Sequence, residues 1–275
     1  SGAGGLADAR FFNCVLAKLA ASHAHLQPLK QGRAMCEVFG AYGWAEGAPM
    51  MKGLIDHLLV RGINRFVPHA FSPTFPDPDC PPHFHADGYN PQSTAFAALM
   101  GYTNKVAHLF EGAQHIANAA ILYHAEAEWS GRPYQLLDEP AAELYERQID
   151  FDIVCLDMLA GATVADGKLC LHRERFDCLV VPYAAWLPPA GLERLAELER
   201  KGLPLVFVDG RPEGVAFGIV VPLAELAATF AARGWTDLRL DRPVPLLRAY
   251  HAVRGEAQLF MFCNESESDP LDAIV

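Results

Sequence analysis

The sequence predicts an α/β fold with two successive units built on parallel strands, followed by the start of a β domain. Short apolar segments alternate with segments of helical period along most of the chain, which is the pattern of strand-helix-strand units. Four of the apolar segments contain almost no polar residue, as expected for strands that helices cover on both faces. Near the C-terminus two such segments follow each other directly, and this indicates an antiparallel hairpin.

Composition and charge limit the classes of function. The chain has 275 residues, of which 51% are hydrophobic and 20% charged, so it can form one large core or two ordinary ones. The net charge of −11 disfavours nucleic acid as a partner. No apolar stretch approaches the roughly 20 residues of a membrane span. Seven cysteines without a CxxC spacing, and an N-terminus without a secretory signal, predict a cytoplasmic protein.

The first unit is expected to span residues 1–116. Helices are predicted where apolar residues recur at helical spacing, and strands where short apolar runs are bounded by glycine or proline. Pro68 must end its strand or lie at a bulge, because it cannot donate a hydrogen bond to a neighbouring strand. The predicted order is helix 7–26, strand 33–39, helix 49–62, strand 63–71, a long loop rich in proline and histidine at 72–90, and helix 93–111.

The second unit is expected to span residues 117–243, and the β domain residues 244–275. An Asp-Gly pair at 166–167 predicts a tight hairpin turn. The predicted strands of the second unit are 119–124, 152–156, 178–182 and 203–209, with a short fifth candidate at 235–240, and its predicted helices are 139–148, 189–201 and a segment around 223–230. The C-terminal hairpin is predicted from residues 247–253 and 258–263.

Glu37 is the first candidate for a catalytic residue. It lies near the C-terminal end of the first predicted strand, and small and aromatic residues, among them Trp44, follow it. In α/β barrels catalytic groups project from the C-terminal ends of strands, and aromatic rings suit the faces of sugars. A capping or ion-paired glutamate is the structural alternative, since one carboxylate is no signature.

Histidines and carboxylates follow the second predicted strand. His69 is expected on the same rim one strand along, where a neutral imidazole can hydrogen-bond a hydroxyl group, although a buried structural histidine fits the pattern equally well. The long loop adds His83, His85, Asp87 and Tyr89 as groups that line a ligand. Zinc is a less favoured alternative there, because the His-x-His spacing lacks a second pair of ligands. No metal or cofactor is predicted.

Polar residues also follow the first strand of the second unit. Glu126 and Glu128 come just after it, at the edge where open α/β sheets bind ligands, and they are predicted to contact substrate. A solvated loop is the alternative. The glycines at 210, 214 and 218 do not have the spacing of a nucleotide-binding loop. The segment after strand 178–182 lacks the glycine-flanked nucleophile of a glutaminase-type hydrolase.

Residues 36–44, 51–56 and 61–71 together resemble the last strands of the barrel in large glycoside hydrolases. The similarity is to family-106 α-L-rhamnosidases and, more distantly, to family-42 β-galactosidases. The resemblance implies that residues 1–116 are the last strands and helices of a (β/α)8 barrel. It also implies that a flavodoxin-like domain, similar to class I glutamine amidotransferases without their nucleophile, comes next and that a β-sandwich follows.

The resemblance implies a glycoside hydrolase whose active site is incomplete in this chain. By comparison with family 42, Glu37 would be the nucleophile of a retaining enzyme. Family 106 is inverting, and Glu37 would then be a base, an acid or a carboxylate that holds the ligand. Retaining chemistry needs a second carboxyl group about 5–5.5 Å away, and inverting chemistry needs one about 6.5–9.5 Å away. Because the predicted strands do not contain the second carboxyl group, the choice between the two mechanisms stays open.

A second hypothesis is a non-catalytic carbohydrate-binding or oligomerisation module built on the amidotransferase-like domain. A cysteine hydrolase is a third hypothesis, and the missing nucleophile weakens it. The leading hypothesis gives a carbohydrate as the substrate. Because a partial barrel exposes strand edges and apolar surface, a homo-oligomer is expected.

Overall fold

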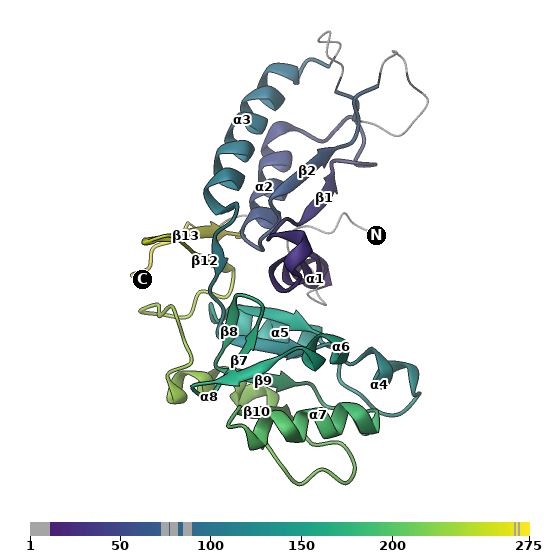
Figure 1. The fold of residues 1–275 in the computed structure, drawn as a ribbon. Coiled ribbons are helices and arrows are strands. Elements are labelled where there is room, and N and C mark those ends of the chain that lie inside the picture. The colour runs from purple at the N-terminus through teal and green to yellow at the C-terminus, as the bar shows by residue number, and fades with distance from the viewer. Residues whose placement is uncertain (1–11, 73–76, 78–81, 85–89, 267, 269) are drawn as a thin grey trace.

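The computed structural model describes residues 12–72, 77, 82–84, 90–266, 268 and 270–275. They form two lobes (Figure 1). Helix α1 (Phe12–Leu26) and a hairpin near the C-terminus lie between the lobes. The first lobe contains strands β1 (Met35–Val38) and β2 (Arg65–Pro68) with helices α2 (Ala48–Leu59) and α3 (Ser93–Phe110), and the second contains a five-stranded sheet with its covering helices.

Five parallel strands form the centre of the second lobe. They are β4 (Ala119–Leu122), β5 (Phe151–Val154), β9 (Cys178–Val181), β10 (Leu205–Val208) and β11 (Ile219–Val221). In space their order is β5-β4-β9-β10-β11. Numbered along the chain this is 2-1-3-4-5, a common doubly wound order in which the direction of winding reverses between β4 and β9. The reversal marks an edge of the sheet where such folds bind ligands.

Apolar layers cover both faces of this sheet, which explains why every residue of β4, β5, β9 and β10 is buried. One face packs against α5 (Asp138–Tyr145), α8 (Leu226–Arg233) and the first turns of α1. The other face packs against α6 (Leu156–Ala160), α7 (Pro189–Arg200) and a small antiparallel sheet. That sheet consists of β6 (Thr163–Ala165), β7 (Lys168–Leu171) and β8 (Glu174–Phe176), and residues 166–167 form the predicted turn.

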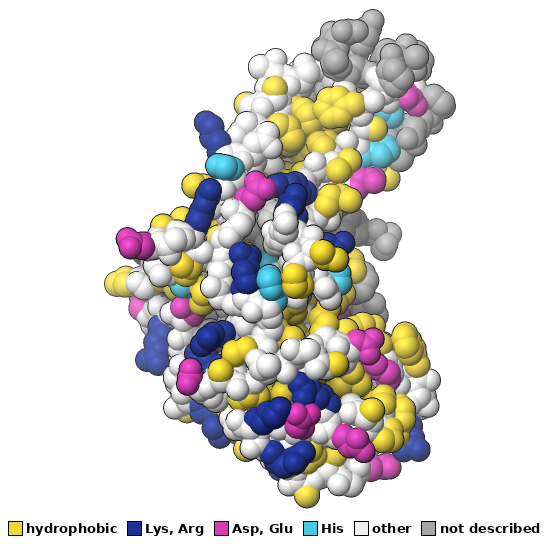
Figure 2. Space-filling model, in the orientation of Figure 1, with side chains coloured by type: hydrophobic (Ala, Val, Ile, Leu, Met, Phe, Trp, Pro, Cys, Tyr) yellow, Lys and Arg dark blue, Asp and Glu magenta, His cyan; other side chains and the backbone are white. Residues whose placement is uncertain are grey.

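The first lobe is a pair of parallel strands with helices on one face. Cys36 and Val38 of β1 pack toward Ile55 of α2 and Phe96 of α3. Pro49 lies in the first turn of α2, where its missing N–H has no helical partner to lose. Figure 2 shows apolar side chains gathered on this lobe over α2, β1 and β2, with histidine side chains beside them.

The C-terminal hairpin connects the lobes. Strand β12 (Leu247–Arg254) pairs with β13 (Ala257–Asn264) on one side and with β3 (Gln114–His115) on the other. Tyr250 and Ala252 pack against Val60 and Ala113 at the base of the first lobe. The short helix α4 (Ala125–Trp129) and two 3-10 turns, η1 (Pro28–Lys30) and η2 (Leu223–Glu225), complete the described elements.

The structure confirms the α/β class and the parallel sheet, and Pro68 ends β2 as predicted. The predicted strand at 235–240 is wrong, because these residues form no strand. Strand β11 takes the edge position beside β10, and Trp235 packs against Phe230 with ring centroids 5.4 Å apart. The first lobe has two strands among the residues described, so these residues form no closed barrel.

None of the helices in the described part of the chain is both long and apolar enough to cross a membrane.

Candidate functional site

Glu37 lies on the open face of the two-stranded sheet. Successive residues of a strand point to opposite faces, so Glu37 points away from the helices that Cys36 and Val38 contact. Val67 is its partner in register on β2. Met35 and Val67 share this face and are 60% and 50% exposed, and Glu37 is exposed as well. The carboxylate therefore stands on an apolar sheet face that is open to ligands.

The turn after β1 brings Glu37 next to His69. The backbone N–H of His69 donates to the carbonyl of Val38 at 2.8 Å, which extends the pairing of β1 and β2. A Cβ atom placed on Gly40 would lie 3.6 Å from Glu37 Oε1 and 3.5 Å from Cγ of the His69 ring. The two side chains flank one small space, which a glycine leaves open. Two residues predicted at neighbouring strand ends thus lie together.

Trp44 and His83 form a second part of this group. Their ring centroids are 5.6 Å apart, and Trp44 is 52% exposed whereas His83 is buried. Nδ1 of His83 lies 3.0 Å from Oγ of Ser72. Backbone hydrogen bonds of 3.2 and 2.7 Å join Ala70 to residues 82–84. Because Ala70 directly follows His69, the described part of the histidine-rich loop runs beside the strand end that carries His69.

Phenylalanines support this part of the site. Phe84 stacks on Phe96 of α3 with centroids 4.1 Å apart, and Phe39 contacts both rings edge-on at 6.0 and 6.2 Å. Phe71 lies 6.0 Å from Phe84 and is 58% exposed. The cluster fixes the loop against α3 and leaves one aromatic ring available to a ligand.

A cavity of about 580 Å³ opens beside the edge of β1 at which no strand pairs among the residues described. All of β1 lines it, together with residues of α1 and α2, so Glu37 is part of its wall. Trp44, His69 and His83 do not line it. The ring of His69 instead lies on the other side of Gly40, within 3.5 Å of a Cβ atom placed on that glycine.

Glu46 is a buried carboxyl group near Trp44 that the sequence pattern did not single out. It is 1% exposed, and neither carboxyl oxygen has a hydrogen-bond partner among the described residues. Burial raises its pKa to about 7, because removal from water disfavours the charged form. The side chain of Gln92 holds this loop by donating to the carbonyl of Glu46 at 3.0 Å. No spacing in the sequence signals such burial.

The remaining predicted residues fall into two groups. His85, Asp87 and Tyr89 lie outside the described residues. Glu126 and Glu128 lie on α4, in the second lobe and apart from β1 (Figure 1). The structure therefore does not bring these two glutamates to Glu37.

The edge that carries Glu126 and Glu128 is a site candidate of its own, because it lies where the winding of the sheet reverses. His124, at the start of α4, is fully buried, and neither ring nitrogen has a hydrogen-bond partner among the residues that the structure describes. Burial lowers the pKa of His124 and raises that of Glu128. Trp129 is 81% exposed beside them.

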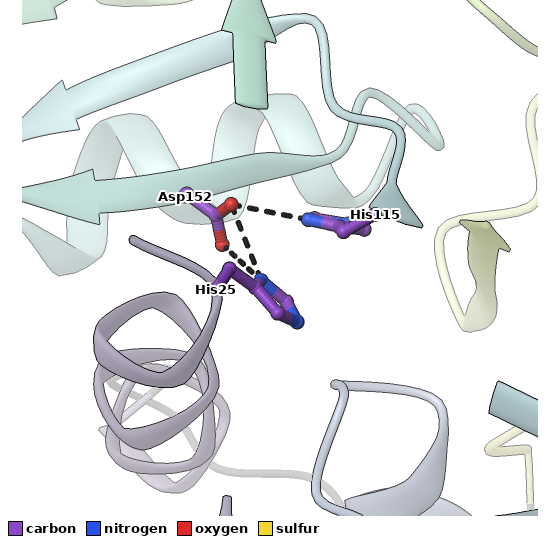
Figure 3. Close-up of side chains that lie close together, drawn as sticks. All are labelled: His25, His115 and Asp152. Atoms are coloured by element: carbon purple, nitrogen blue, oxygen red, sulfur yellow. Dashed lines mark hydrogen bonds and ion pairs between the residues drawn. The ribbon is translucent and has the colours of Figure 1, made fainter. Parts of the chain in front are cut away.

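A buried cluster of charged side chains lies between the lobes, where α1 meets β5 and β3. Nδ1 of His25 lies 3.0 Å from Asp152 Oδ1, and Nδ1 of His115 lies 3.1 Å from Asp152 Oδ2 (Figure 3). His115 Nε2 lies 2.8 Å from Asp150, which also accepts a hydrogen bond of 2.7 Å from Lys18. In the described part of the chain, His25, His115 and Asp152 are the one group of side chains that could hold a metal ion.

No protein-family model matches the sequence, and no curated protein is similar to it in sequence. Several solved structures have a similar fold over most of the chain. A rhamnosidase from Novosphingobium sp. PP1Y superposes with a TM-score of 0.69 at 16% identity over 91% of this chain. An apo exo-carrageenase GH42 from Bacteroides ovatus superposes with a TM-score of 0.58 at 11% identity over 84% of it.

These similarities show a glycoside-hydrolase-like fold. The chain covers 27% of the rhamnosidase and 35% of the exo-carrageenase, so it spans about a quarter to a third of the length of these neighbours.

Proposed function

We propose that this chain is part of a glycoside hydrolase in which Glu37 is a catalytic carboxylate. The observation that carries the proposal is the placement of Glu37 at the C-terminal end of a parallel strand, on an exposed face, with His69 beside it on the next strand. Catalytic carboxylates of α/β barrels occupy such positions, and the two fold neighbours of the preceding section are glycoside hydrolases.

The first lobe has the features of a barrel segment. Its two strands are parallel, their helices lie on one face, and apolar residues on the other face are exposed. A sheet of two strands is only marginally stable alone, so we propose that further strands of a longer protein pair at the edge of β1 and face Glu37 with a second carboxyl group. The second lobe corresponds in this proposal to the flavodoxin-like, amidotransferase-like domain, and the hairpin to the first strands of a β-sandwich.

The roles of the other residues follow from their positions. His69 would hydrogen-bond a sugar hydroxyl or orient Glu37, and the exposed ring of Trp44 would stack on a sugar face. The buried ring of His83 would position Trp44 through their contact. His85, Asp87 and Tyr89 of the same loop would complete the sugar-binding subsite. Glu37 would act as nucleophile or as base, depending on how far away the second carboxyl group lies.

The proposal is tested on the longest natural protein that contains this chain. Aryl glycosides of α-L-rhamnose and β-D-galactose are the first substrates, since these sugars are named by the families that the sequence resembles. Release of the aryl group above the uncatalysed rate is the expected result. A folded full-length protein that hydrolyses neither these nor a wider panel of aryl glycosides would rule out the function.

Carbohydrate binding without catalysis by the second lobe is a second candidate function. It is favoured by the 81% exposure of Trp129 next to Glu126 and Glu128, at the sheet edge where the winding reverses. Titration with oligosaccharides should then quench tryptophan fluorescence in the wild type and not in Trp129→Ala. Sedimentation of the same samples tests the proposed homo-oligomer, and a monomer that responds to no sugar would count against both roles.

A further inference from the structure

The buried cluster between the lobes has the geometry of a metal site. Its two imidazoles come from α1 and β3 and converge with their Nδ1 atoms on one carboxylate from β5 (Figure 3). The donor atoms of His25, His115 and Asp152 all lie within 4.8 Å of one another. All three side chains are at least nine-tenths buried.

The separations fit a small divalent ion. Nδ1 of His25 lies 3.0 and 3.2 Å from the two oxygens of Asp152, and Nδ1 of His115 lies 3.1 Å from Oδ2. Zinc bonds of about 2.0–2.2 Å at a tetrahedral angle separate two ligand atoms by roughly 3.3–3.6 Å. The contacts of Asp152 with the two imidazoles are therefore within a few tenths of an ångström of the separations in a zinc site, and all three donor atoms lie within 4.8 Å of one another.

Each of the three side chains also makes a hydrogen bond to a residue outside the group. His115 Nε2 lies 2.8 Å from Asp150 Oδ2, and His25 Nε2 lies 3.2 Å from the hydroxyl of Tyr250. Ser22 donates a hydrogen bond of 2.9 Å to Asp152 Oδ1. In metal sites a histidine ligand almost always donates its second N–H to a carboxylate, a carbonyl or water, and ligating carboxylates are themselves hydrogen-bonded.

Glu174 is a further buried carboxyl group near the cluster. Glu174 of β8 is 1% exposed, and neither of its oxygens has a hydrogen-bond partner among the described residues. It interacts electrostatically with His115 and Asp152, so it lies close to the cluster. Lys18 is the one lysine or arginine that pairs with Asp150 or Asp152 in the described residues. A zinc ion would take the place of the protons that His25 and His115 share with Asp152.

The buried pair of His57 and Glu265 differs from the cluster of His25, His115 and Asp152 in its partners. Nδ1 of His57 lies 2.8 Å from Glu265 Oε1, but Arg61 and Arg248 also donate to that carboxylate at 2.7 Å each. Two guanidinium groups satisfy Glu265, and in the described part of the chain His57 is the one imidazole bonded to it. The pair of His57 and Glu265 therefore needs no ion.

We propose that His25, His115 and Asp152 bind a zinc ion that joins α1, β3 and β5. The ion would be structural, because the site is buried between the lobes and away from Glu37. The inference does not depend on the proposed hydrolase function.

The test uses the full chain of 275 residues, dialysed first against EDTA and then against buffer. After one equivalent of zinc is added, gel filtration and elemental analysis should recover one zinc per chain. The melting temperature should rise by roughly 5 °C or more, because a ligand that binds only the folded state stabilises it. Wild-type protein that retains no zinc and shows no shift would overturn the proposal.

Variants separate this site from adventitious binding by surface histidines. His25→Gln and Asp152→Asn should each weaken zinc binding at least about 10-fold. His57→Gln is the matched control, since it breaks a buried contact between a histidine and a carboxylate without touching the cluster, and it should bind zinc like the wild type. Equal zinc affinity in His25→Gln and wild type would overturn the assignment even if the chain binds zinc elsewhere. Should both cluster variants fail to fold, X-ray absorption by the zinc-loaded wild type decides. Two histidine nitrogens and carboxylate oxygen are expected around the zinc, and a sulfur ligand or a shell without histidine would overturn the assignment.

Discussion

Arg61 holds the carboxylate of Glu265 with two hydrogen bonds although 204 residues separate them in the sequence. The contacts are 2.7 Å from Nη1 to Oε1 and 3.1 Å from Nη2 to Oε2. Burial raises the pKa of Glu265, but the hydrogen bonds from His57 and Arg61 outweigh burial and bring it to about 2. This contact fastens the end of the C-terminal hairpin to the end of α2.

Acid should weaken the protein through this carboxylate. The pKa of Glu265 is about 2 in the folded chain against an ordinary value of 4.5. Its contribution is therefore complete above pH 4.5 and is lost as the pH falls toward 2, and it amounts to about 3 kcal/mol. Glu265→Gln should cost about 3–5 kcal/mol at pH 7, because two guanidinium groups stay buried without their carboxylate. Urea unfolding of the wild type and of Glu265→Gln at pH 7 and pH 3 measures this. An equal decrease in the free energy of unfolding of both proteins between pH 7 and pH 3 would contradict it.

Glu46 should act on stability with the opposite sign. Its pKa is about 7 in the folded chain against an ordinary 4.5, so stability present below pH 4.5 is lost as the pH rises to 7. Glu46→Gln should raise the free energy of unfolding at pH 8 by up to about 3 kcal/mol and change it little at pH 4. Glu256→Gln, in the exposed turn between β12 and β13, is the control and should have no effect at either pH. The same gain for Glu46→Gln at both pH values would show that burial does not perturb Glu46.

Gly218 should be far more sensitive to substitution than Gly214. Both residues have a positive φ, of 72° and 78°, so alanine is strained at either position. A Cβ atom on Gly218 would also lie 2.5 Å from the ring of Phe207, whereas one on Gly214 would meet nothing within 4 Å. Gly218→Ala should destabilise the protein by about 2–4 kcal/mol and Gly214→Ala by about 1 kcal/mol. Thermal unfolding compares them, and equal losses would show that β11 does not pack tightly against β10.

Gly40→Ala should reduce hydrolysis without unfolding the protein. The added methyl group would fill the space between Glu37 Oε1 and the ring of His69 at ordinary contact distances of 3.5–3.6 Å. The methyl group would displace a substrate that enters this space, and a misplacement of about 1 Å can cost 100-fold in rate. We therefore expect kcat/KM to fall at least about 10-fold while the melting temperature changes by less than about 2 °C. Unchanged kcat/KM would mean that no substrate atom enters this space.

Local patterns carried much of the fold prediction. The strands β4, β5, β9 and β10 were predictable because strands covered on both faces are apolar throughout. Strand β11 has three residues and follows a glycine-containing loop, so it gives almost no periodic signal. The false strand at 235–240 arose because the pattern does not show that β11 already occupies the sheet edge.

The positions of the candidate site residues were predictable only where two neighbouring strands determine them. Glu37 and His69 follow from the rule that parallel strands end at one edge. The burial of Glu46, and the contact of Lys18 with Asp150 across 132 residues, depend on how distant elements pack. A single sequence contains no periodic signal for such contacts, and for the same reason the cluster of His25, His115 and Asp152 was not found.

Replacing Glu37 tests the central claim most directly. In the full-length protein, kcat/KM for an aryl glycoside that the wild type hydrolyses should fall about 10²–10⁴-fold in Glu37→Gln, with an unchanged melting temperature. Glu256→Gln removes an exposed carboxylate far from β1 and should keep wild-type activity. Wild-type turnover by Glu37→Gln would show that Glu37 is not catalytic.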